Sequence, residues 1–385
     1  MLSSFFGWIM IFTLAFRNLF YDRIRLAVTL IGILFSIVLV AIQLGLYFGA
    51  TKIIVGMIEH ADGDLWITTY GAKSFEEGGV NLTPRERHSA LATPGVASVT
   101  PIVVAFSEWR KPAGGSTTVV LVGADPQDKV LRPWSMATGS PDAILAPDGI
   151  AIDRTYLEDL GVTAVGERAQ IENGRVRVVA ITDGIRSFTM APYVFTTLSR
   201  ARTLLGAPQE KSSYFLVKLQ PGAGLEAVRG DLASRLTGTE VLTKAEFRQR
   251  SLNQWLFSTG AGVALIGGAL LGLLVGTVIV AQTLYSSTKD HLSEFATLRA
   301  LGSTAGYIHR VILTQAAFSA IIGYALGMAI ALVITSFSEA TALPLEMTPW
   351  LAAGLFVITI GMCAVSAISA ILKVTKIDPA MVFSR

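Results

Sequence analysis

The sequence predicts an α-helical membrane protein with four transmembrane helices and a large α+β extracytoplasmic domain between the first and the second. Three observations predict this class. Hydrophobic residues make up 52% of the 385 residues and charged residues only 15%, which is too apolar for a soluble protein of this length. Four long runs contain no Asp, Glu, Lys or Arg. Between the first and second runs lies a stretch of ordinary polarity, long enough for one or two compact units.

Each uncharged run exceeds the roughly 20 residues that a helix needs to cross a bilayer. A helix is expected because it pairs every backbone N–H and C=O internally where water is absent. A core helix of a soluble protein is the alternative, which the length of the runs disfavours. We therefore predict, in chain order, a cytoplasmic or interfacial amphipathic helix over 1–25, transmembrane helix 26–51, extracytoplasmic domain 52–250, transmembrane helix 251–288, cytoplasmic helix and turn 289–310, transmembrane helices 311–338 and 347–372, and cytoplasmic tail 373–385.

The N-terminal segment carries an apolar stripe. Residues of the stripe recur every three or four positions: Phe5, Ile9, Phe12, Phe16 and Phe20. This spacing predicts a helix that lies in the inner interface of the membrane. A fifth, short span is the alternative, but the stretch FFGWIMIFTLAF would reach only about 18 Å.

Basic residues set the orientation. Nine Lys and Arg lie outside residues 52–255, and all nine fall on one side of a four-span arrangement. By the positive-inside rule, both termini and the 289–310 connection are cytoplasmic, and the large domain faces outward. The single cysteine, Cys363, lies in the fourth run, so the outward domain is expected to hold together without disulfides.

The outward domain shows alternating strand and helix patterns. Five β-branched or aromatic runs read as strands: DLWITTY, SVTPIVVAFSEWR, TTVVLVGA, VRVVAITDG and SYFLVKLQ. Three segments between or after them read as helices: TPRERHSALATPG, DRTYLEDLG and GLEAVRGDLASRL. Thr83 and Asp153 are expected N-caps and Gly161 a C-cap.

Catalytic and metal-binding patterns are missing from the sequence. The four histidines are scattered, and neither G-x-S-x-G nor H-E-x-x-H occurs. The acidic pairs Glu76–Glu77 and Glu158–Asp159 are expected to be solvated surface. No Gly-Lys dipeptide exists, so the chain has no P-loop. We expect no enzyme activity, no metal site, no cofactor and no nucleic-acid partner; membrane lipids surround the spans, and any energy source is a partner protein.

Small residues form a stripe in the second run, at intervals of four: Gly260, Ala264, Gly268, Gly272 and Gly276. A weaker stripe follows in the third run: Ser319, Gly323, Gly327 and Ala331. On a helix, such stripes let another backbone approach closely, either within the subunit or across a dimer; a groove facing lipid is the alternative. Trp255 and Tyr285 bracket the second run about 45 Å apart on a continuous helix, as interfacial aromatic residues do.

The connection between the second and third runs contains the stretch SEFATLRALGS. Apolar residues at intervals of three give it one apolar edge: Leu292, Phe295, Leu298 and Leu301. Gly302 can end this helix in the left-handed conformation, and Ser303 can cap the next one. A solvated loop helix without special purpose is the alternative.

This stretch resembles the signature of FtsX/MacB-type (type VII, mechanotransmission) ABC transporter permeases, which read Glu-Ile-(Ala/Gly) and then Leu-Arg-Ala-Leu-Gly-Ala. Matching positions include Glu294, Leu298, Arg299, Leu301 and Gly302, whereas Phe295 replaces the usual isoleucine. Gln315 stands where many members have a glutamate. Asp378 and Pro379 resemble the closing Asp-Pro segment, and ADGDLWITTYG is closest to DevC-like permeases.

The resemblance implies a permease subunit for export or extraction of a lipid, lipoprotein, peptide or drug. It implies a place in the bacterial inner membrane, two cytoplasmic ABC ATPase subunits that bind ATP and Mg, a second permease in a homodimer, and a periplasmic adaptor with an outer-membrane duct. The short helix becomes the coupling helix that contacts the ATPase through these residues: Glu294, Phe295, Leu298, Arg299, Leu301 and Gly302. An FtsX-like regulator of cell-wall hydrolases and a membrane receptor with a sensing domain are the alternatives.

Overall fold

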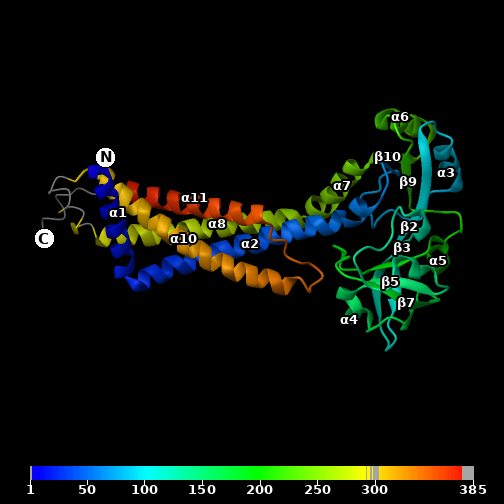
Figure 1. Ribbon diagram of the computed structural model, residues 1–385, viewed down its shortest axis with the longest axis horizontal. Coiled ribbons are helices and arrows are strands. Elements are labelled where there is room, and N and C mark those ends of the chain that lie inside the picture. The colour runs from blue at the N-terminus through cyan, green and yellow to red at the C-terminus, as the bar shows by residue number, and fades with distance from the viewer. Residues whose placement is uncertain (1, 292, 295–296, 298–302, 375–385) are drawn as a thin grey trace. The chain divides into compact units, whose positions relative to one another are not determined.

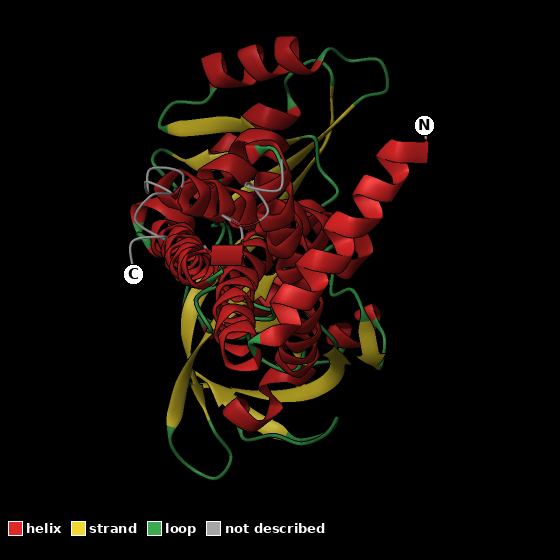
Figure 2. Ribbon diagram, turned by 90° about the vertical axis from the view of Figure 1, so that its left-hand side faces the viewer, coloured by secondary structure: helices red, strands yellow, loops and turns green. Residues whose placement is uncertain are grey.

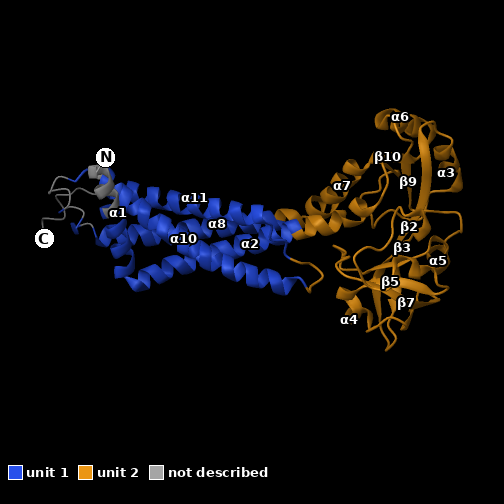
Figure 3. Ribbon diagram, viewed as in Figure 1, with its two compact units in different colours: residues 1–48, 264–339, 345–385 blue, residues 49–263, 340–344 orange. Residues whose placement is uncertain are grey.

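The computed structural model describes residues 2–291, 293–294, 297 and 303–374 and divides the chain into two compact units. The first, which we call the helix unit, comprises Met1–Phe48, Ala264–Glu339 and Leu345–Arg385. The second, the sheet unit, comprises Gly49–Val263 and Ala340–Pro344 (Figure 3). The described strands, drawn as yellow arrows in Figure 2, all belong to the sheet unit.

The helix unit is built on long, apolar helices that lie side by side (Figure 1). Their bounds are α1 (Leu2–Tyr21), α2 (Arg23–His60, which continues into the sheet unit), α8 (Ala261–Asp290), α10 (Ala305–Ser338) and α11 (Pro349–Val374). Within the described residues, four helices are long and apolar enough to cross a membrane: α2, α8, α10 and α11. The predicted fold class, four such helices with an α+β domain between the first and the second, is confirmed.

The second spanning helix begins ten residues later than the run 251–288 predicts. Residues Asn253–Ser258 form a π-helix, and α8 starts only after Gly260, whose φ of +80° lies in the left-handed region. Trp255 and Tyr285 therefore do not share one continuous α-helix, so the predicted separation of about 45 Å along such a helix does not apply, and their place at the two membrane interfaces remains a prediction. A run without charged residues shows which segment can span a membrane. It does not show where the backbone hydrogen bonding changes from one helix type to another.

Four helices share one apolar core in the helix unit. The core includes Ile33 and Ile37 of α2, Val280 of α8, Ala316 of α10 and Cys363 of α11, each at most 3% exposed. These are aliphatic or small side chains that pack closely in ordinary rotamers. The four helices thus form a packed bundle within one subunit.

Helix α1 packs on α10 rather than standing apart. Ile11 and Ala15 are buried against Val311, and the rings of Phe12 and Phe16 lie edge-on to Phe318 at centroid distances of 5.8 and 6.1 Å. The buried face is therefore offset from the predicted phenylalanine stripe, of which Phe12, Phe16 and Phe20 remain largely exposed.

The sheet unit contains one ten-stranded mixed sheet in the order β10-β1-β9-β2-β3-β8-β5-β7-β4, with β6 paired to β2 and β7. Strand bounds are β1 (Leu65–Thr69), β2 (Val96–Arg110), β3 (Ser116–Gly123), β4 (Met136–Thr138), β5 (Gly149–Asp153), β6 (Arg168–Ile171), β7 (Gly174–Thr182), β8 (Tyr193–Thr196), β9 (Tyr214–Leu219) and β10 (Thr239–Thr243). The long β2 joins two halves, because its first part pairs with β9 and its second part with β3. Pairs β3–β8 and β5–β7 are parallel, and the remaining pairs are antiparallel.

Short helices cover this sheet: α3 (Pro84–Leu91), α4 (Leu157–Leu160), α5 (Leu198–Leu204), α6 (Leu225–Arg235) and α7 (Lys244–Leu252). All five predicted strands form, as β1, β2, β3, β7 and β9. Thr83 closes a capping box with Glu86, and Gly161 ends α4 at φ +66°, as predicted. The strands that the sequence did not reveal are only three to five residues long, too short to show a period.

Candidate functional site

The glycines of α8 bring this helix into close contact with α2. A Cβ built on Gly268 would lie 2.7 Å from Gln43 Nε2, and one on Gly272 would lie 3.0 Å from Leu39 Cδ2. A Cβ on Gly276 would lie 2.9 Å from Met362 Sδ and closer still to the Cβ and Oγ of Ser36. A Cβ at Gly276 would overlap the Cβ of Ser36, whereas at Gly268 and Gly272 the flexible ends of Gln43 and Leu39 would have to shift. The small residues on this face therefore allow the α2 and α8 backbones to approach closely.

Glycines of α10 contact the same helix from a second direction. A Cβ on Gly327 would lie 3.0 Å from the Cβ of Ile37, and one on Gly323 would clash with the Ile33 side chain. Helix α2 thus has glycine-containing faces of both α8 and α10 packed against it, so a displacement of α2 would press directly on both neighbours.

The five-residue stripe predicted on α8 is only partly realised. Gly268, Gly272 and Gly276 face α2, whereas Gly260 precedes the helix and Ala264 is exposed. The described contacts of the three glycines are within the subunit. A dimer contact on this helix remains a prediction.

Hydrogen bonds from side-chain hydroxyl groups to main-chain carbonyls connect the helices. Ser36 Oγ of α2 donates to Gly272 O at 2.8 Å, and Ser366 Oγ of α11 donates to Thr277 O at 2.9 Å. Tyr324 of α10 donates to Ala352 O of α11 at 2.8 Å. In an apolar environment such bonds fix the register of neighbouring helices at a modest energetic gain.

The start of α2 and the end of α8 meet at a charged cavity. Arg25 lies 2.5 Å from Asp290 and 3.4 Å from Asp22. These residues line the cavity together with Tyr21, Arg23, Ile24, His291 and Glu294. The Arg25–Asp290 pair joins α2 to α8 next to the predicted coupling segment.

Of the predicted coupling residues, the structure describes one. Glu294 is exposed, and its carboxylate lies 3.1 Å from His291 Nδ1. The other five lie outside the described residues: Phe295, Leu298, Arg299, Leu301 and Gly302. Gln315, the departure from the family pattern, is buried in α10 at 4% exposure.

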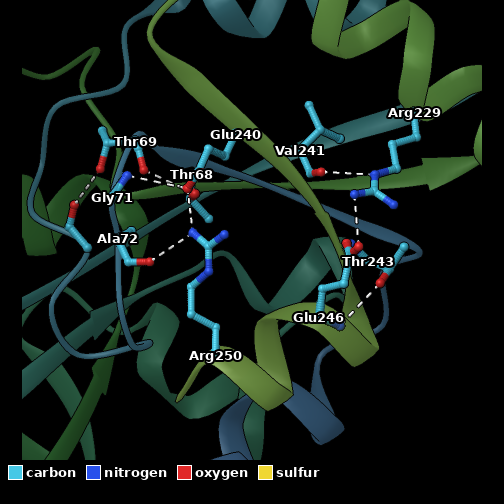
Figure 4. A network of polar contacts seen from close by, with 11 residues as sticks. Thr68, Thr69, Gly71, Ala72, Arg229, Glu240, Val241, Thr243, Glu246 and Arg250 are labelled. Carbon is cyan, nitrogen blue, oxygen red and sulfur yellow. Dashed lines mark hydrogen bonds and ion pairs between the residues drawn. The ribbon is translucent and has the colours of Figure 1, made fainter. Parts of the chain in front are cut away.

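In the sheet unit, a polar network holds α7, the helix that precedes the π-helix and α8 (Figure 4). Arg250 of α7 pairs with Glu240 of β10 and donates to Ala72 O at 3.3 Å. Glu240 also accepts from the Gly71 N–H at 3.3 Å. The C-terminal part of α7 is therefore tied to β10 and to the loop after β1.

A second group of contacts holds the start of α7. Thr243 and Glu246 form a capping box, and Arg229 of α6 lies 2.9 Å from Glu246 and donates to Val241 O at 3.2 Å (Figure 4). Partial burial opposes ionisation of Glu246, but the hydrogen bonds from Thr243 and the Arg229 cation outweigh it and lower the pKa of this carboxyl. Glu246 therefore stays ionised and holds both the cap and Arg229.

Glu76 is not a surface residue, so the prediction for this member of the Glu76–Glu77 pair is wrong. Its side chain is 2% exposed, and its carboxylate accepts hydrogen bonds from Tyr193 of β8 and, at 3.3 Å, from Trp255 Nε1. Burial raises the pKa of Glu76, although these hydrogen bonds act in the opposite direction. Its neighbour Glu77 is exposed as predicted.

Sequence reasoning missed α7 and the residues around it. The Thr-x-x-Glu pattern of Thr243 and Glu246 was an available signal for a helix start. No local signal marks Glu76, because its partners are 117 and 179 positions away in the sequence.

Family comparisons agree with this architecture. Residues 26–235 match the model of the MacB-like periplasmic core domain, and residues 266–379 match that of the FtsX-like permease C-terminal region. The first of these covers more than half of the chain.

Several known proteins are similar to this chain. The "Uncharacterized ABC transporter permease Rv0072" of Mycobacterium tuberculosis is 25% identical over 384 residues, 96% of this chain and 98% of the relative. The "Macrolide export ATP-binding/permease protein MacB" of Rhodospirillum rubrum is 23% identical over 87% of this chain and 54% of its own length. The crystal structure of the periplasmic region of MacB from Actinobacillus actinomycetemcomitans matches 51% of this chain and 96% of that structure, with 13% identity and a TM-score of 0.38.

Both parts of the family pattern are thus present in one chain, the periplasmic core domain between the first and second spanning helices and the permease region in the last three. ABC transporters of this kind work with partner ATPase subunits, and the permease itself performs no catalysis. This chain belongs to the MacB/FtsX-type family of ABC transporter permeases, as a non-catalytic, multi-pass membrane subunit with an extracytoplasmic domain.

Proposed function

We propose that this permease transmits motion from cytoplasmic ATPase subunits to its outward domain and so drives export or extraction of a substrate at the outer face of the inner membrane. One observation carries the proposal. Helix α7 is held to the sheet by two sets of ion pairs, and only eight residues separate its end from α8. Any displacement of α8 along its axis would therefore act on a helix that the outward domain holds firmly.

The arrangement of the helix unit supports the same function. The close α2–α8 and α2–α10 contacts and the Arg25–Asp290 pair favour movement of the helices as a group. Similarity to a protein named for macrolide export supports an exporter over a regulator of cell-wall hydrolases or a receptor. The substrate class we propose is a lipid, lipoprotein, peptide or drug.

The proposed assembly contains two permeases, as a homodimer, and two ATPase subunits that bind ATP and Mg. The DevC-like resemblance of ADGDLWITTYG further favours a periplasmic adaptor and an outer-membrane duct. Both termini and the connection after α8 lie in the cytoplasm of this assembly.

The proposal is tested by purification with and without the ATPase. Expressed alone, the chain should hydrolyse no ATP, because it has no Gly-Lys phosphate loop. Expressed with its ATPase, it should form a complex with two copies of each subunit, measured by native mass spectrometry. An ATPase variant that binds but does not hydrolyse ATP is the control. Turnover by the isolated permease at the rate of a transport ATPase would refute the proposal.

Membrane orientation gives a separate prediction. Reporter fusions after Gly174 and Ala342 should report the outer side of the membrane. Fusions after Ser293 and Arg385 should report the cytoplasm, because all nine basic residues outside 52–255 fall on the side of these two positions. A cytoplasmic signal at Gly174 would reverse the assigned orientation.

A further inference from the structure

The buried carboxylate of Glu76 connects two elements that are far apart in the sequence. Glu76 follows β1 and lies inside the sheet unit, with its backbone neighbours Ser74 and Phe75 accepting hydrogen bonds from the Tyr214 hydroxyl at 2.8 and 2.9 Å. Its Oε1 accepts from Tyr193, and its Oε2 accepts from Trp255. The two oxygens thus bind one donor from the sheet and one donor from the segment Asn253–Ser258.

That segment is a π-helix, an uncommon backbone form that often occurs at functional positions. It lies between α7, which the sheet holds, and α8. Trp255 is its described polar link to Glu76, and the Trp255 ring also contacts Phe188 at a centroid distance of 5.8 Å. Leu256, the next residue, is 1% exposed.

The position of Glu76 is energetically costly. An ionised carboxylate that is withdrawn from water loses solvation, and hydrogen bonds recover only part of it. The titratable groups that face it include Tyr193 on β8 and Tyr214 on β9, both with a pKa raised well above the ordinary value, first by burial and then by the Glu76 charge. Glu77 adjoins it on the same loop, and Tyr156 lies close enough to Tyr193 to raise its pKa further.

We propose that Glu76 is a positioning residue that holds the π-helical segment Asn253–Ser258 in register through Trp255 Nε1, and that its ionised form holds the segment more firmly than its protonated form. A charged acceptor binds an N–H more strongly than a neutral one, so loss of the charge weakens the contact while leaving the fold in place. Transmission of motion by this segment rests on the proposed function. The positioning role of Glu76 does not.

The test is hydrogen–deuterium exchange of the full chain in lipid nanodiscs, followed in peptides that cover residues 253–260 and expressed as protection relative to unstructured chain. At a pH where Glu76 is ionised, Glu76→Gln should reduce protection of these amides by roughly threefold to tenfold, because a neutral amide oxygen replaces a charged acceptor in the hydrogen bond from Trp255. Glu77→Gln makes the same chemical change at the adjacent, exposed position and should have no effect.

Trp255→Phe gives a second, independent variant, because it keeps an aromatic ring near Phe188 while it removes the N–H donor together with part of the indole volume. It should reduce protection at least as much as Glu76→Gln. Combined with Glu76→Gln, it should add little to the single Trp255→Phe change, since both changes act on the same hydrogen bond. Should Glu76→Gln fail to fold, protection of residues 253–260 in Trp255→Phe still tests whether the hydrogen bond to Glu76 holds the segment.

A pH profile separates positioning from a purely structural role. Because burial raises the folded-state pKa of Glu76 above its ordinary 4.5, its contribution to stability is full below that value and is lost as pH rises through the folded pKa. The melting temperature of the natural chain should therefore fall relative to Glu76→Gln as pH rises. Protection of residues 253–260 should change in the opposite direction, increasing as Glu76 ionises.

Opposite pH trends of melting temperature and local protection are the expected result. If protection of residues 253–260 in Glu76→Gln and Trp255→Phe equals that in Glu77→Gln, or if protection and melting temperature change together with pH in the natural chain, Glu76 does not position this segment. Neither measurement requires the ATPase, so failure here leaves the proposed function untouched.

Discussion

Phe295→Asp is expected to weaken binding of the ATPase subunit roughly 100-fold while the permease still folds and inserts. Phe295 lies on the apolar edge of the predicted coupling helix. If that edge is buried against the ATPase, an unpaired carboxylate there is costly, and a loss of about 2.7 kcal/mol already lowers affinity 100-fold. The folding effect should be small, because a short helix outside the bilayer contributes little to the packed bundle. Pull-down of the ATPase by the purified permease measures the effect, with melting temperature recorded in parallel.

Matched variants make this result specific. Leu298→Asp should act like Phe295→Asp, whereas Arg299→Glu should weaken binding less if the side chain lies at the rim, where salt screens the charge. The control is Glu77→Lys, which changes an exposed residue of the sheet unit; the buried Glu76 would be unsuitable. Full ATPase binding by a folded Phe295→Asp permease would show that this helix does not couple the two subunits.

Gly276→Ala is expected to destabilise the helix unit by about 1–3 kcal/mol, the usual cost of forcing an extra methyl into a packed core. The new methyl group would overlap Ser36 and lie 2.9 Å from Met362 Sδ. Helices α2 and α8 would have to separate, which would also lengthen the Ser36–Gly272 hydrogen bond. The unfolding free energy in a detergent titration measures the loss, and Gly276→Leu should prevent native packing altogether.

Gly267→Ala is the matched control, since it lies on the same helix and a Cβ there meets nothing within 4 Å. Both changes gain the same helix propensity, about 1 kcal/mol, so their difference isolates packing against α2. Ser36→Gly should partly rescue Gly276→Ala by removing the opposing Cβ. Equal stability of the two alanine variants would contradict the close α2–α8 contact.

Much of the architecture was predictable because its causes are local. Long uncharged runs favour membrane helices, and β-branched runs between Gly, Pro or Asp favour strands, so the four long apolar helices and five of the ten strands follow from composition and period. Thr83 and Gly161 cap helices for reasons within their own turn. The signature from Glu294 to Gly302 likewise identified the family from contiguous residues.

The sequence by itself determined which segments are long and apolar enough to span the membrane, that an α+β domain lies between the first and the second of them, and that the chain is a permease of this family. Only the tertiary structure decided which face of each helix is used. It placed three of the five stripe residues against α2, began α8 only after Gly260 in place of a longer continuous helix, and buried Glu76 between Tyr193 and Trp255. The physical reason is sequence separation: a period or a cap acts over a few residues, whereas burial of a carboxylate or close approach of two backbones depends on partners brought together from distant parts of the chain.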